Sequence, residues 1–483
     1  MKKNIIKSFM LLSVFAMGIS ALTGCGTQAK NDDHVLNIIC LNKGYGREWI
    51  DELVKEWESK NPGYTVNLTA ESSSEDLINK HLYSKGNIDD LYIGNSKAWK
   101  EYAMRDKLLV LDDFLNEEVD GMTVLNKIND EYKKSIYYNG HTYRLPWTSG
   151  VPGIYYNATM FEENHWEVPT TFDELLALCE TIKNANVGVG QGGKVTTTVK
   201  PFVYTGENPD YFDYATFTWW GQLAGKEAVD NYLKYESAST FSTSNPGFAA
   251  LGQALKMWWQ IFGNKDYYVA DSKKWTNHLA QQSFYNGYAA MMINCDWLYN
   301  ETLKYTDDNQ FRPGFSLKIM ETPAASNKVT DKISYIVGED QYFAIPKTTI
   351  KADLAKSFIK LMISDKGINT FAEKAHGTMA YKTSSKVVTE DAYTNSLFDY
   401  LENAEQTFTN WSDSKLFLMN VIDIWTENNL APYTRIANAY ENDQKQGKNK
   451  DKEKSSYVDD YMKEVSDNAK SQWSNWVTKA GGK

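Results

Sequence analysis

The chain has 483 residues, a formal net charge of −11 at pH 7 and 14% aromatic residues, including 15 Trp and 31 Tyr. An acidic chain without a basic patch repels phosphate backbones, which argues against nucleic acid as a partner. A chain of this length can bury more than one hydrophobic core, so the length favours two lobes.

The N-terminus predicts export and a lipid anchor. Three lysines precede an apolar stretch from about Phe9 to Leu22, which is shorter than a transmembrane helix of roughly 20 residues and has the layout of a secretory signal. The stretch runs into Leu22-Thr23-Gly24-Cys25, which resembles a bacterial lipobox; the alternative is an ordinary signal with a chance cysteine. We therefore predict a signal peptide at residues 1–24, lipidation at Cys25 and a flexible tether at residues 25–34. The mature chain would lie on the extracellular face of a bacterial membrane, with the lipid as its membrane attachment.

The other cysteines and the histidines predict neither a disulfide framework nor a metal site. Cys40, Cys179 and Cys295 each lie in an apolar context and are predicted to be small buried hydrophobes. The six histidines are scattered, and no two have the His-x-x-x-His spacing of a catalytic zinc site. We expect no metal and no cofactor.

The aromatic content bears on the kind of ligand. Sugar rings have apolar C–H faces and rims of hydroxyl groups, and the flat rings of Trp and Tyr carry a polar group that suits both features. Most of these side chains are expected to fill cores, but their excess favours a carbohydrate ligand.

The first part of the chain after the tether alternates between strand and helix patterns. The predicted elements are a strand at Val35–Leu41, a helix with apolar residues from Trp49 to Trp57, a strand at Tyr64–Thr69, a helix at Glu75–Tyr83, a strand at Asp89–Ile93 and a helix at Ser96–Arg105. This order is typical of βαβ units with a largely parallel sheet, so we expect an α/β fold.

Ligands of open α/β sheets bind at the carboxyl ends of the strands. In this chain that rule selects the loops at residues 43–47, 71–74 and 94–96. Tyr45, Arg47 and Asn95 are the candidates that could hydrogen-bond to hydroxyl groups. The alternative, that these loops are only helix caps and turns, is strongest for the serines and weakest for Tyr45 and Arg47.

Two later regions have distinct patterns. Residues 187–200 are rich in glycine, but a nucleotide-binding loop would need a preceding strand and a following helix, and neither is predicted here. We interpret this run as a flexible loop. From Asp423 onward the pattern is helical, and a set of apolar residues has the spacing of a helix that packs on a lobe. These residues are Tyr457, Tyr461, Val465, Trp473 and Trp476.

Three segments carry a family signature. The first contains Tyr143-Arg-Leu-Pro146, Tyr155-Tyr-Asn157 and Pro169-Thr-Thr-Phe-Asp-Glu-Leu175, the second is Phe284-Tyr-Asn-Gly-Tyr-Ala-Ala-Met-Met-Ile-Asn-Cys-Asp-Trp297, and the third runs from Ile345-Pro-Lys347 through a helix at Ala352–Phe371. Together they resemble the extracellular solute-binding proteins of carbohydrate ABC importers, the family that includes maltose-binding proteins. Within the first segment, Thr171 is predicted to cap a helix whose first turn carries two acids.

The resemblance implies a periplasmic-binding-protein-like fold, in which two α/β lobes are joined by hinge strands and the ligand lies between them. Residues 35–145 and 341–395 would form one lobe and residues 146–340 the other. Residues 396–483 would be a helical segment that belongs mainly to the second lobe. The chain would cross between the lobes near residues 144–147, 338–342 and 390–410.

The resemblance also implies site residues. In maltose-type members the tryptophan that ends the second segment packs against a sugar ring, so Trp297 is the leading ligand-binding residue. Asp296 lies beside it, where a carboxylate could accept two sugar hydroxyls. Of the adjacent Trp219 and Trp220, one is expected to face the cleft and the other the core. The remaining aromatic candidates are Trp147 and Tyr45.

The predicted function is that of a monomeric, non-enzymatic binding protein that captures a carbohydrate, with an oligosaccharide favoured, and delivers it to the permease subunits of an ABC importer. Two alternatives are a glycan-binding sensor or adhesin, and a binding protein for a peptide or another non-sugar solute. A third is a glycoside hydrolase with paired carboxylates, although the chain contains no recognised hydrolase signature.

Overall fold

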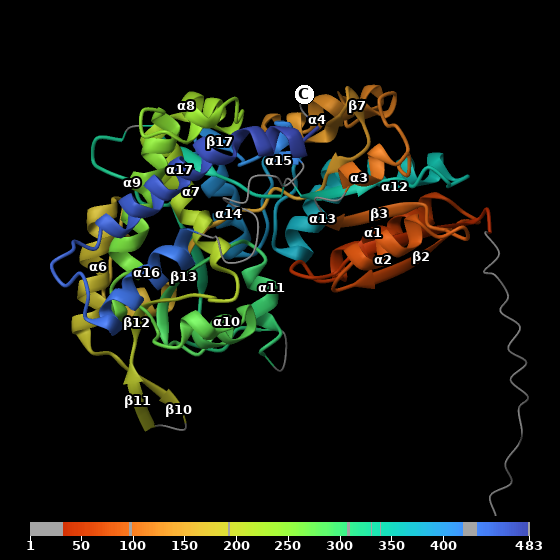
Figure 1. Ribbon diagram of the computed structural model, residues 1–483. Helices are drawn as coiled ribbons and strands as arrows, with labels where there is room; N and C mark the ends of the chain where they lie inside the picture. The colour runs from red at the N-terminus through yellow and green to blue at the C-terminus, as the bar shows by residue number, and fades with distance from the viewer. Residues whose placement is uncertain are drawn as a thin grey trace, which may run out of the picture.

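The computed structural model describes residues 32–95, 99–191, 194–306, 310–329, 331–338, 340–418 and 432–481. The predicted signal peptide, Cys25 and most of the predicted tether lie outside these residues. Within them, two sheets, each flanked by helices, belong to two lobes that lie side by side (Figure 1).

The first lobe is built on a five-stranded sheet with the strand order β2-β1-β3-β16-β8. The strands β2, β1 and β3 are parallel, as predicted, whereas β16 is antiparallel to both β3 and β8. The first lobe therefore receives its reversed strand from a part of the chain that returns from the other lobe. The strands are β1 (Val35–Leu41), β2 (Thr65–Glu71), β3 (Leu91–Asn95), β8 (Leu145–Pro146) and β16 (Gln341–Ala344).

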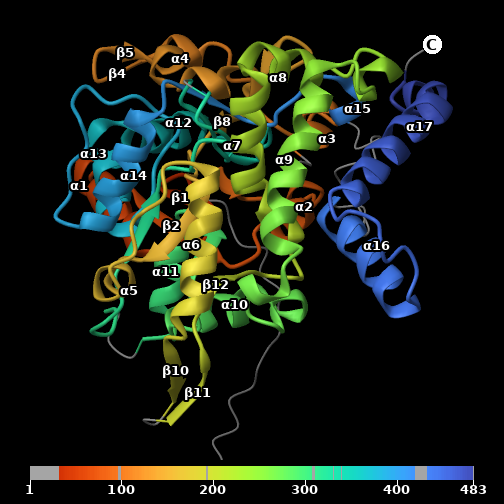
Figure 2. The ribbon, with the colours of Figure 1, turned by 90° about the vertical axis from the view of Figure 1, so that its left-hand side faces the viewer.

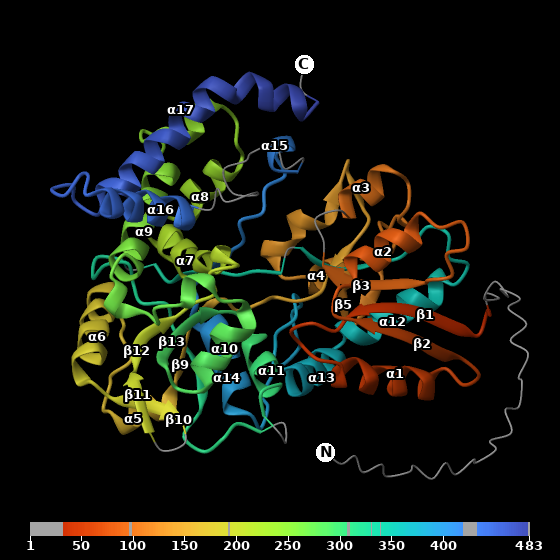
Figure 3. The same cartoon turned by 60° about the horizontal axis from the view of Figure 1, so that its bottom comes forward.

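Helices cover both faces of this sheet (Figure 3). Trp49, Ile50, Leu53 and Trp57, whose spacing predicted the first helix, are buried, and this helix packs against the two helices that follow β16. The helices are α1 (Glu48–Lys60), α2 (Glu75–Leu82), α3 (Trp99–Met104), α4 (Val124–Lys127), α12 (Ala352–Ile363), α13 (Asp365–Ala375) and the short 3₁₀ helices η1 (Phe114–Asn116) and η2 (Asp130–Ile136). Two small hairpins complete the lobe, β4 (Glu118–Val119) with β5 (Met122–Thr123) and β6 (Tyr137–Tyr138) with β7 (His141–Thr142).

The second lobe is built on a four-stranded sheet with the order β12-β13-β9-β14. Only β12 and β13 are parallel, because β9 is antiparallel to both of its neighbours. Every residue of the central strand β13 is buried, as expected for a strand that is covered on both faces. The strands are β9 (Gly153–Asn157), β12 (Lys200–Val203), β13 (Ala289–Asn294) and β14 (Leu317–Met320).

The helices of the second lobe include the one whose cap the sequence predicted. Thr171 accepts a hydrogen bond from the Glu174 backbone N–H, and the Glu174 carboxylate accepts one from the Thr171 N–H. This reciprocal pair satisfies two donors that the helix start leaves free. The helices are α5 (Ala158–Glu163), α6 (Phe172–Ala185), α7 (Asp213–Ala224), α8 (Lys226–Leu233), α9 (Pro246–Phe262), α10 (Asn277–Tyr285), α11 (Leu298–Leu303), α14 (Ala392–Asn403), η3 (Pro209–Phe212), η4 (Ala238–Phe241), η5 (Lys265–Tyr267) and η6 (Ser272–Lys274).

The C-terminal helices α16 (Pro432–Gln446) and α17 (Ser456–Lys479) lie along the second lobe beside α9 (Figure 2). The predicted packing of this tail is confirmed, because four of its five residues are buried in the core of the lobe and Trp473 is half-buried. A short helix, α15 (Lys415–Leu418), precedes them. Residues 419–431, part of the predicted helical region, lie outside the described ranges.

The prediction of a flexible loop at residues 187–200 was wrong. The strands β10 (Gly188–Gln191) and β11 (Lys194–Thr198) form an antiparallel hairpin that projects from the second lobe (Figures 1 and 2). A Cβ atom at Gly190 would lie 1.9 Å from the Lys194 carbonyl oxygen, so glycine is what permits this close pairing. The β-branched residues that follow favour an extended strand.

Three connections join the lobes. They run from β8 to β9, from β15 (Ile333–Tyr335) to β16, and from α13 to α14. Strand β15 pairs with β17 (Gln406–Phe408). The first two lie at or next to the predicted positions. The third, at residues 376–391, precedes the predicted span because α14 already packs on β14. The predicted single helix at residues 352–371 is two helices, because Ser364 interrupts it and caps α13 through the Gly367 N–H.

Candidate ligand-binding site

Trp297 lies at the junction of the two lobes. It follows the central strand β13, is half-buried, and packs against the hydrophobic cores of both lobes. From the first lobe, the loop between β1 and α1 comes so close that a Cβ atom at Gly44 would lie 3.1 Å from the Trp297 Cβ. Gly44 also has a φ of +88°, so a side chain there is disfavoured for both reasons. The carboxyl end of one strand from each lobe thus converges on this indole.

Three tyrosines surround Trp297. The ring centroids of Tyr45, Tyr211 and Tyr214 lie 6.4, 6.3 and 6.1 Å from that of Trp297, with interplanar angles of 85°, 75° and 76°. None is stacked parallel to the indole, and Tyr211 and Tyr214 are themselves half-buried. The second lobe therefore presents a cluster of three partly accessible aromatic rings, formed by Trp297, Tyr211 and Tyr214, beside the first lobe.

Tyr211 and Tyr214 were not among the site residues predicted from the sequence. The available signal was their spacing of three residues at the start of a helical segment, which places two side chains on one helix face.

Asp296 connects the lobes and does not face a ligand. It is fully buried, and its Oδ1 accepts a hydrogen bond from the Tyr45 hydroxyl of the first lobe at 3.1 Å. The Cys295 thiol donates to the same oxygen at 3.2 Å, and the Thr378 N–H donates to Oδ2 at 3.4 Å. This corrects the expectation that the carboxylate binds sugar hydroxyls, because both oxygens are already bonded within the protein.

The surroundings of Asp296 favour its neutral form. Burial raises the pKa of its carboxyl to about 6, although the bonds from Cys295, Tyr45 and Thr378 act in the opposite direction. Burial also raises the pKa of the Cys295 thiol well above its usual value. As predicted, Cys40, Cys179 and Cys295 are all buried and unpaired.

Three predicted aromatic contacts are corrected by their burial. Trp147, Trp219 and Trp220 are at most 1% exposed. Trp219 donates its indole N–H to the Pro323 carbonyl and Trp220 donates to the Gly247 carbonyl. Both are therefore core residues, whereas one of them was expected to face the cleft. Trp147 packs between the helices and loops of the first lobe, 5.5 Å from the Trp49 ring.

The remaining predicted residues lie around the junction in different roles. Tyr45 is buried, with its ring centroid 5.1 Å from that of Phe371, so it packs against both the core of the first lobe and Trp297. The exposed Arg47 guanidinium pairs with Asp51 one helical turn later, at 2.8 Å. Asn95 is half-buried at the carboxyl end of β3, and the residues that follow it, 96–98, are outside the described ranges.

A separate pocket lies between the lobes at the other end of α7. It has a volume of about 800 Å³ and is lined by η2, α8 and residues 406–413. Tyr211 lies in η3 and Tyr214 at the start of α7, and a helix of 12 residues spans roughly 18 Å. This pocket is therefore distinct from the aromatic cluster.

Neither a metal site nor a membrane-spanning helix is found in the part of the chain that the structure describes. There, no group of three or more His, Cys, Asp or Glu side chains is arranged to hold a metal ion. The helices there are too short or too polar to span a bilayer.

The two-lobed α/β architecture with an aromatic cluster at the junction is that of a periplasmic-binding-protein-like solute receptor. The chain belongs to the bacterial extracellular solute-binding protein family, which it matches over residues 43–368. This membership confirms the family that the sequence motifs indicated.

Comparison with individual proteins agrees with this assignment. The chain is 24% identical to the multiple sugar-binding protein of Streptococcus mutans over 249 residues, which are 50% of this chain and 53% of that protein. The match thus spans about half the length of this relative. Among solved structures, apo RafE from Streptococcus pneumoniae has a TM-score of 0.63 at 17% identity, covering 89% of this chain and 98% of RafE. Lmo0181 from Listeria monocytogenes, in complex with cycloalternan, has a TM-score of 0.59 at 14% identity, covering 90% of this chain and 98% of that protein.

Proposed function

We propose that this protein binds a carbohydrate between its lobes, without altering it, and delivers it to an ABC importer. The observation that carries the proposal is the cluster of Trp297, Tyr211 and Tyr214 at the lobe junction. Flat aromatic rings provide apolar surface for the C–H faces of a sugar, and their polar groups can pair with hydroxyls.

The names of similar proteins support this ligand class. One relative is a multiple sugar-binding protein, and proteins of the same fold were solved with raffinose and with cycloalternan. These sugars differ in size, so they support carbohydrate as a class. Asn95 is proposed as a polar contact from the first lobe, because it ends the strand next to β1.

The ligand is tested by a thermal-shift screen with neutral mono- and oligosaccharides. A ligand that binds only the folded state raises its stability by RT ln(1 + [L]/Kd), so a binding sugar raises the melting temperature in a dose-dependent way. Chromatography after long incubation should recover the sugar intact. A released product would contradict the binding-only proposal, and a broad sugar panel without any shift would contradict the ligand class.

The site is tested by Trp297→Ala. Loss of the indole surface is expected to weaken the binding of the sugar found in the screen about tenfold or more, on the order of 1.5 kcal/mol, as measured by calorimetry. The matched control is Trp473→Ala, which removes another half-buried tryptophan of the same lobe from α17 and should leave affinity unchanged. Unchanged affinity in folded Trp297→Ala would remove Trp297 from the site.

We also propose that Cys25 carries the lipid anchor. The support is the sequence Leu22-Thr23-Gly24-Cys25 after an apolar stretch. In a bacterial host the protein should fractionate with membranes, and Cys25→Ser should remain as the uncleaved or non-acylated form in mass spectrometry. A wild-type protein with an unmodified Cys25 would contradict this proposal.

A further inference from the structure

A second, smaller pocket lies on the second lobe, away from Trp297. It has a volume of about 300 Å³ and is formed by the end of α9, the segment that leads into η3, the segment of η5 and η6, and α16. Tyr211 contacts Trp297, whereas the next residue, Phe212, lines this pocket. Successive residues of a 3₁₀ helix point about 120° apart, so the pocket and the junction lie on different sides of η3.

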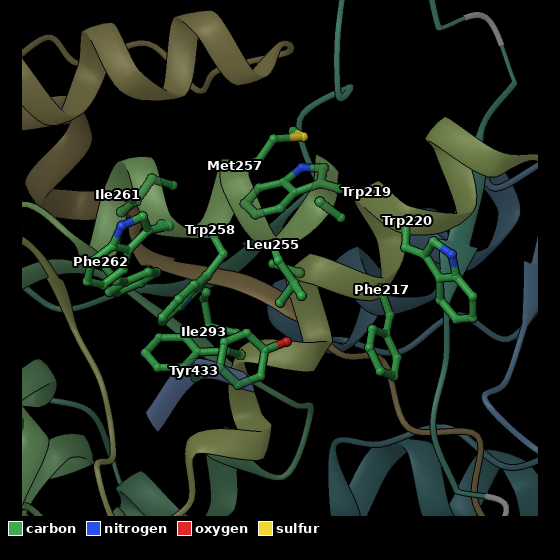
Figure 4. Packing of buried hydrophobic residues seen from close by; sticks show 14 of the residues in the cluster. Phe217, Trp219, Trp220, Leu255, Met257, Trp258, Ile261, Phe262, Ile293 and Tyr433 are labelled. Carbon is green, nitrogen blue, oxygen red and sulfur yellow. The ribbon is translucent and has the colours of Figure 1, made fainter. Parts of the chain in front are cut away.

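Aromatic side chains dominate the lining of this pocket. Trp258 lies beside Phe262 and Tyr433, with its ring centroid 6.2 and 4.7 Å from theirs (Figure 4). A pocket of this volume is at the small end of the range for ligands, which suits a single six-membered ring. The aromatic lining residues are Tyr204, Phe212, Trp258, Trp259, Phe262, Tyr268, Tyr433 and Tyr440.

The indole of Trp258 is a buried part of the pocket wall. Trp258 is 2% exposed, and its Nε1 is sealed from solvent without an acceptor among the residues that the structure describes. The indole nitrogens of Trp99, Trp147 and Trp411 are in the same situation, so this nitrogen does not mark the pocket as a ligand site. Trp258 therefore offers a ligand its ring surface.

The rim of the pocket is basic in an otherwise acidic protein. Lys265, Lys273 and Lys274 line it, with Glu441 as the one acid. Glu441 pairs with Lys273 at 2.9 Å, and Lys274 is 3.7 Å from Asp271, which does not line the pocket. Lys265 is exposed, and its charge helps to lower the pKa of Glu441. The uncompensated charge at the rim is positive, which favours a negatively charged ligand group.

We propose that this pocket is a binding site for a single six-membered ring that carries a carboxylate. The ring would lie against the aromatic lining, and the carboxylate would face the lysines at the rim. A hexuronic acid and an aromatic acid share this chemistry. The proposal is independent of the sugar site at the lobe junction.

The test uses the protein with ¹⁵N-labelled tryptophan and observes the indole N–H signals by NMR. The Trp258 signal is identified by its absence from the spectrum of Trp258→Phe. Glucuronate and benzoate are titrated separately, with glucose as the uncharged ring. We expect at least one of the two acids to shift the Trp258 signal in a saturable way. A response to glucuronate assigns the sugar source, a response to benzoate assigns the aromatic source, and an equal response to glucose overturns the proposed carboxylate.

Three variants test whether the acid binds in this pocket. Trp258→Phe should weaken calorimetric binding of the acid about tenfold, because it removes part of the ring surface that lines the pocket. Lys265→Ala, at an exposed position, should weaken binding about two- to fivefold, whereas Lys463→Ala on α17 should have no effect. Ala437→Phe should abolish binding by filling the pocket from α16. This variant tests the same site if Trp258→Phe does not fold.

Trp297→Ala separates this pocket from the lobe junction. It should leave acid binding intact, and loss of acid binding in this variant would move the ligand to the junction and overturn the proposal. Binding that survives both Trp258→Phe and Ala437→Phe, or the absence of any Trp258 response to either acid, would also overturn it. Neither result would affect the test of neutral sugars at the junction.

Discussion

Asp90 and Asp296 are both fully buried carboxylates, but they hold different parts of the molecule together. Asp90 lies inside the first lobe, where Lys351 Nζ is 2.9 Å away and the Asn37 N–H donates at 2.8 Å. Asp296 lies between the lobes and accepts hydrogen bonds from the Tyr45 hydroxyl, a thiol and a backbone N–H. No cation pairs with it in the described part of the chain.

The difference follows from what each carboxylate has to do. The partners of Asp90 all belong to one lobe, where a buried ion pair is a stable arrangement once both charges are bonded. The partners of Asp296 come from both lobes, so opening of the lobes to admit the proposed ligand would separate them. When its bond to a carboxylate is broken, a neutral donor that bonds to water instead pays a smaller free-energy penalty than a buried lysine does. We therefore expect the junction to be weaker than the interior of the first lobe and to be sensitive to pH.

The largest expected effect comes from Asp90→Ala. It removes the carboxylate that pairs with the Lys351 ammonium, whose side chain is 3% exposed, and loss of one partner of a buried ion pair is expected to cost about 3–5 kcal/mol. Thermal unfolding should show a large fall in melting temperature. The control is Glu101→Ala, which breaks the exposed pair with Arg105 and should cost at most about 1 kcal/mol. Similar small effects for both variants would contradict the distinction.

A smaller effect is expected from ionisation of Asp296. Its pKa is raised from 3.8 to about 6, so the folded state holds a proton that the unfolded chain releases. Stability should therefore fall as the pH rises from about 4 to about 6, by about 3 kcal/mol in total.

The measurement compares melting temperatures of the wild type and Asp296→Asn across this pH range. The difference between them should change in favour of the variant as the pH rises. A difference that does not depend on pH would show that Asp296 is not protonated in the folded protein.

The smallest effect is expected from Tyr45→Phe. It removes one hydrogen bond between the lobes, which is expected to be worth about 1–2 kcal/mol. In the absence of ligand, small-angle X-ray scattering should show a larger radius of gyration for the variant. The control is Tyr92→Phe, which removes the hydrogen bond from the Tyr92 hydroxyl to the Asp89 carboxylate within the first lobe and should lower stability without opening the lobes. Equal radii for both variants would contradict a role of Tyr45 in closure.

The sequence by itself determined the elements whose signals are local. The strand at Val35–Leu41 and the cap at Thr171 were predicted correctly, because hydrophobic period and capping chemistry act over a few residues. The family motifs singled out Trp297, and in the structure it lies at the lobe junction directly after the buried strand β13. The burial of the cysteines was also predicted correctly, because a residue in an apolar stretch of sequence is usually buried in the fold.

Only the tertiary structure decided which aromatic rings are accessible. Trp219 bonds to the Pro323 carbonyl, 104 residues further along the chain, and Tyr45 bonds to Asp296, 251 residues further along. Whether a large ring fills a core or faces a cleft depends on such distant partners, because local pattern fixes the face of a helix but not what covers it. For the same reason Tyr211 and Tyr214 acquired their place beside Trp297 only when η3 and β13 came together in the second lobe.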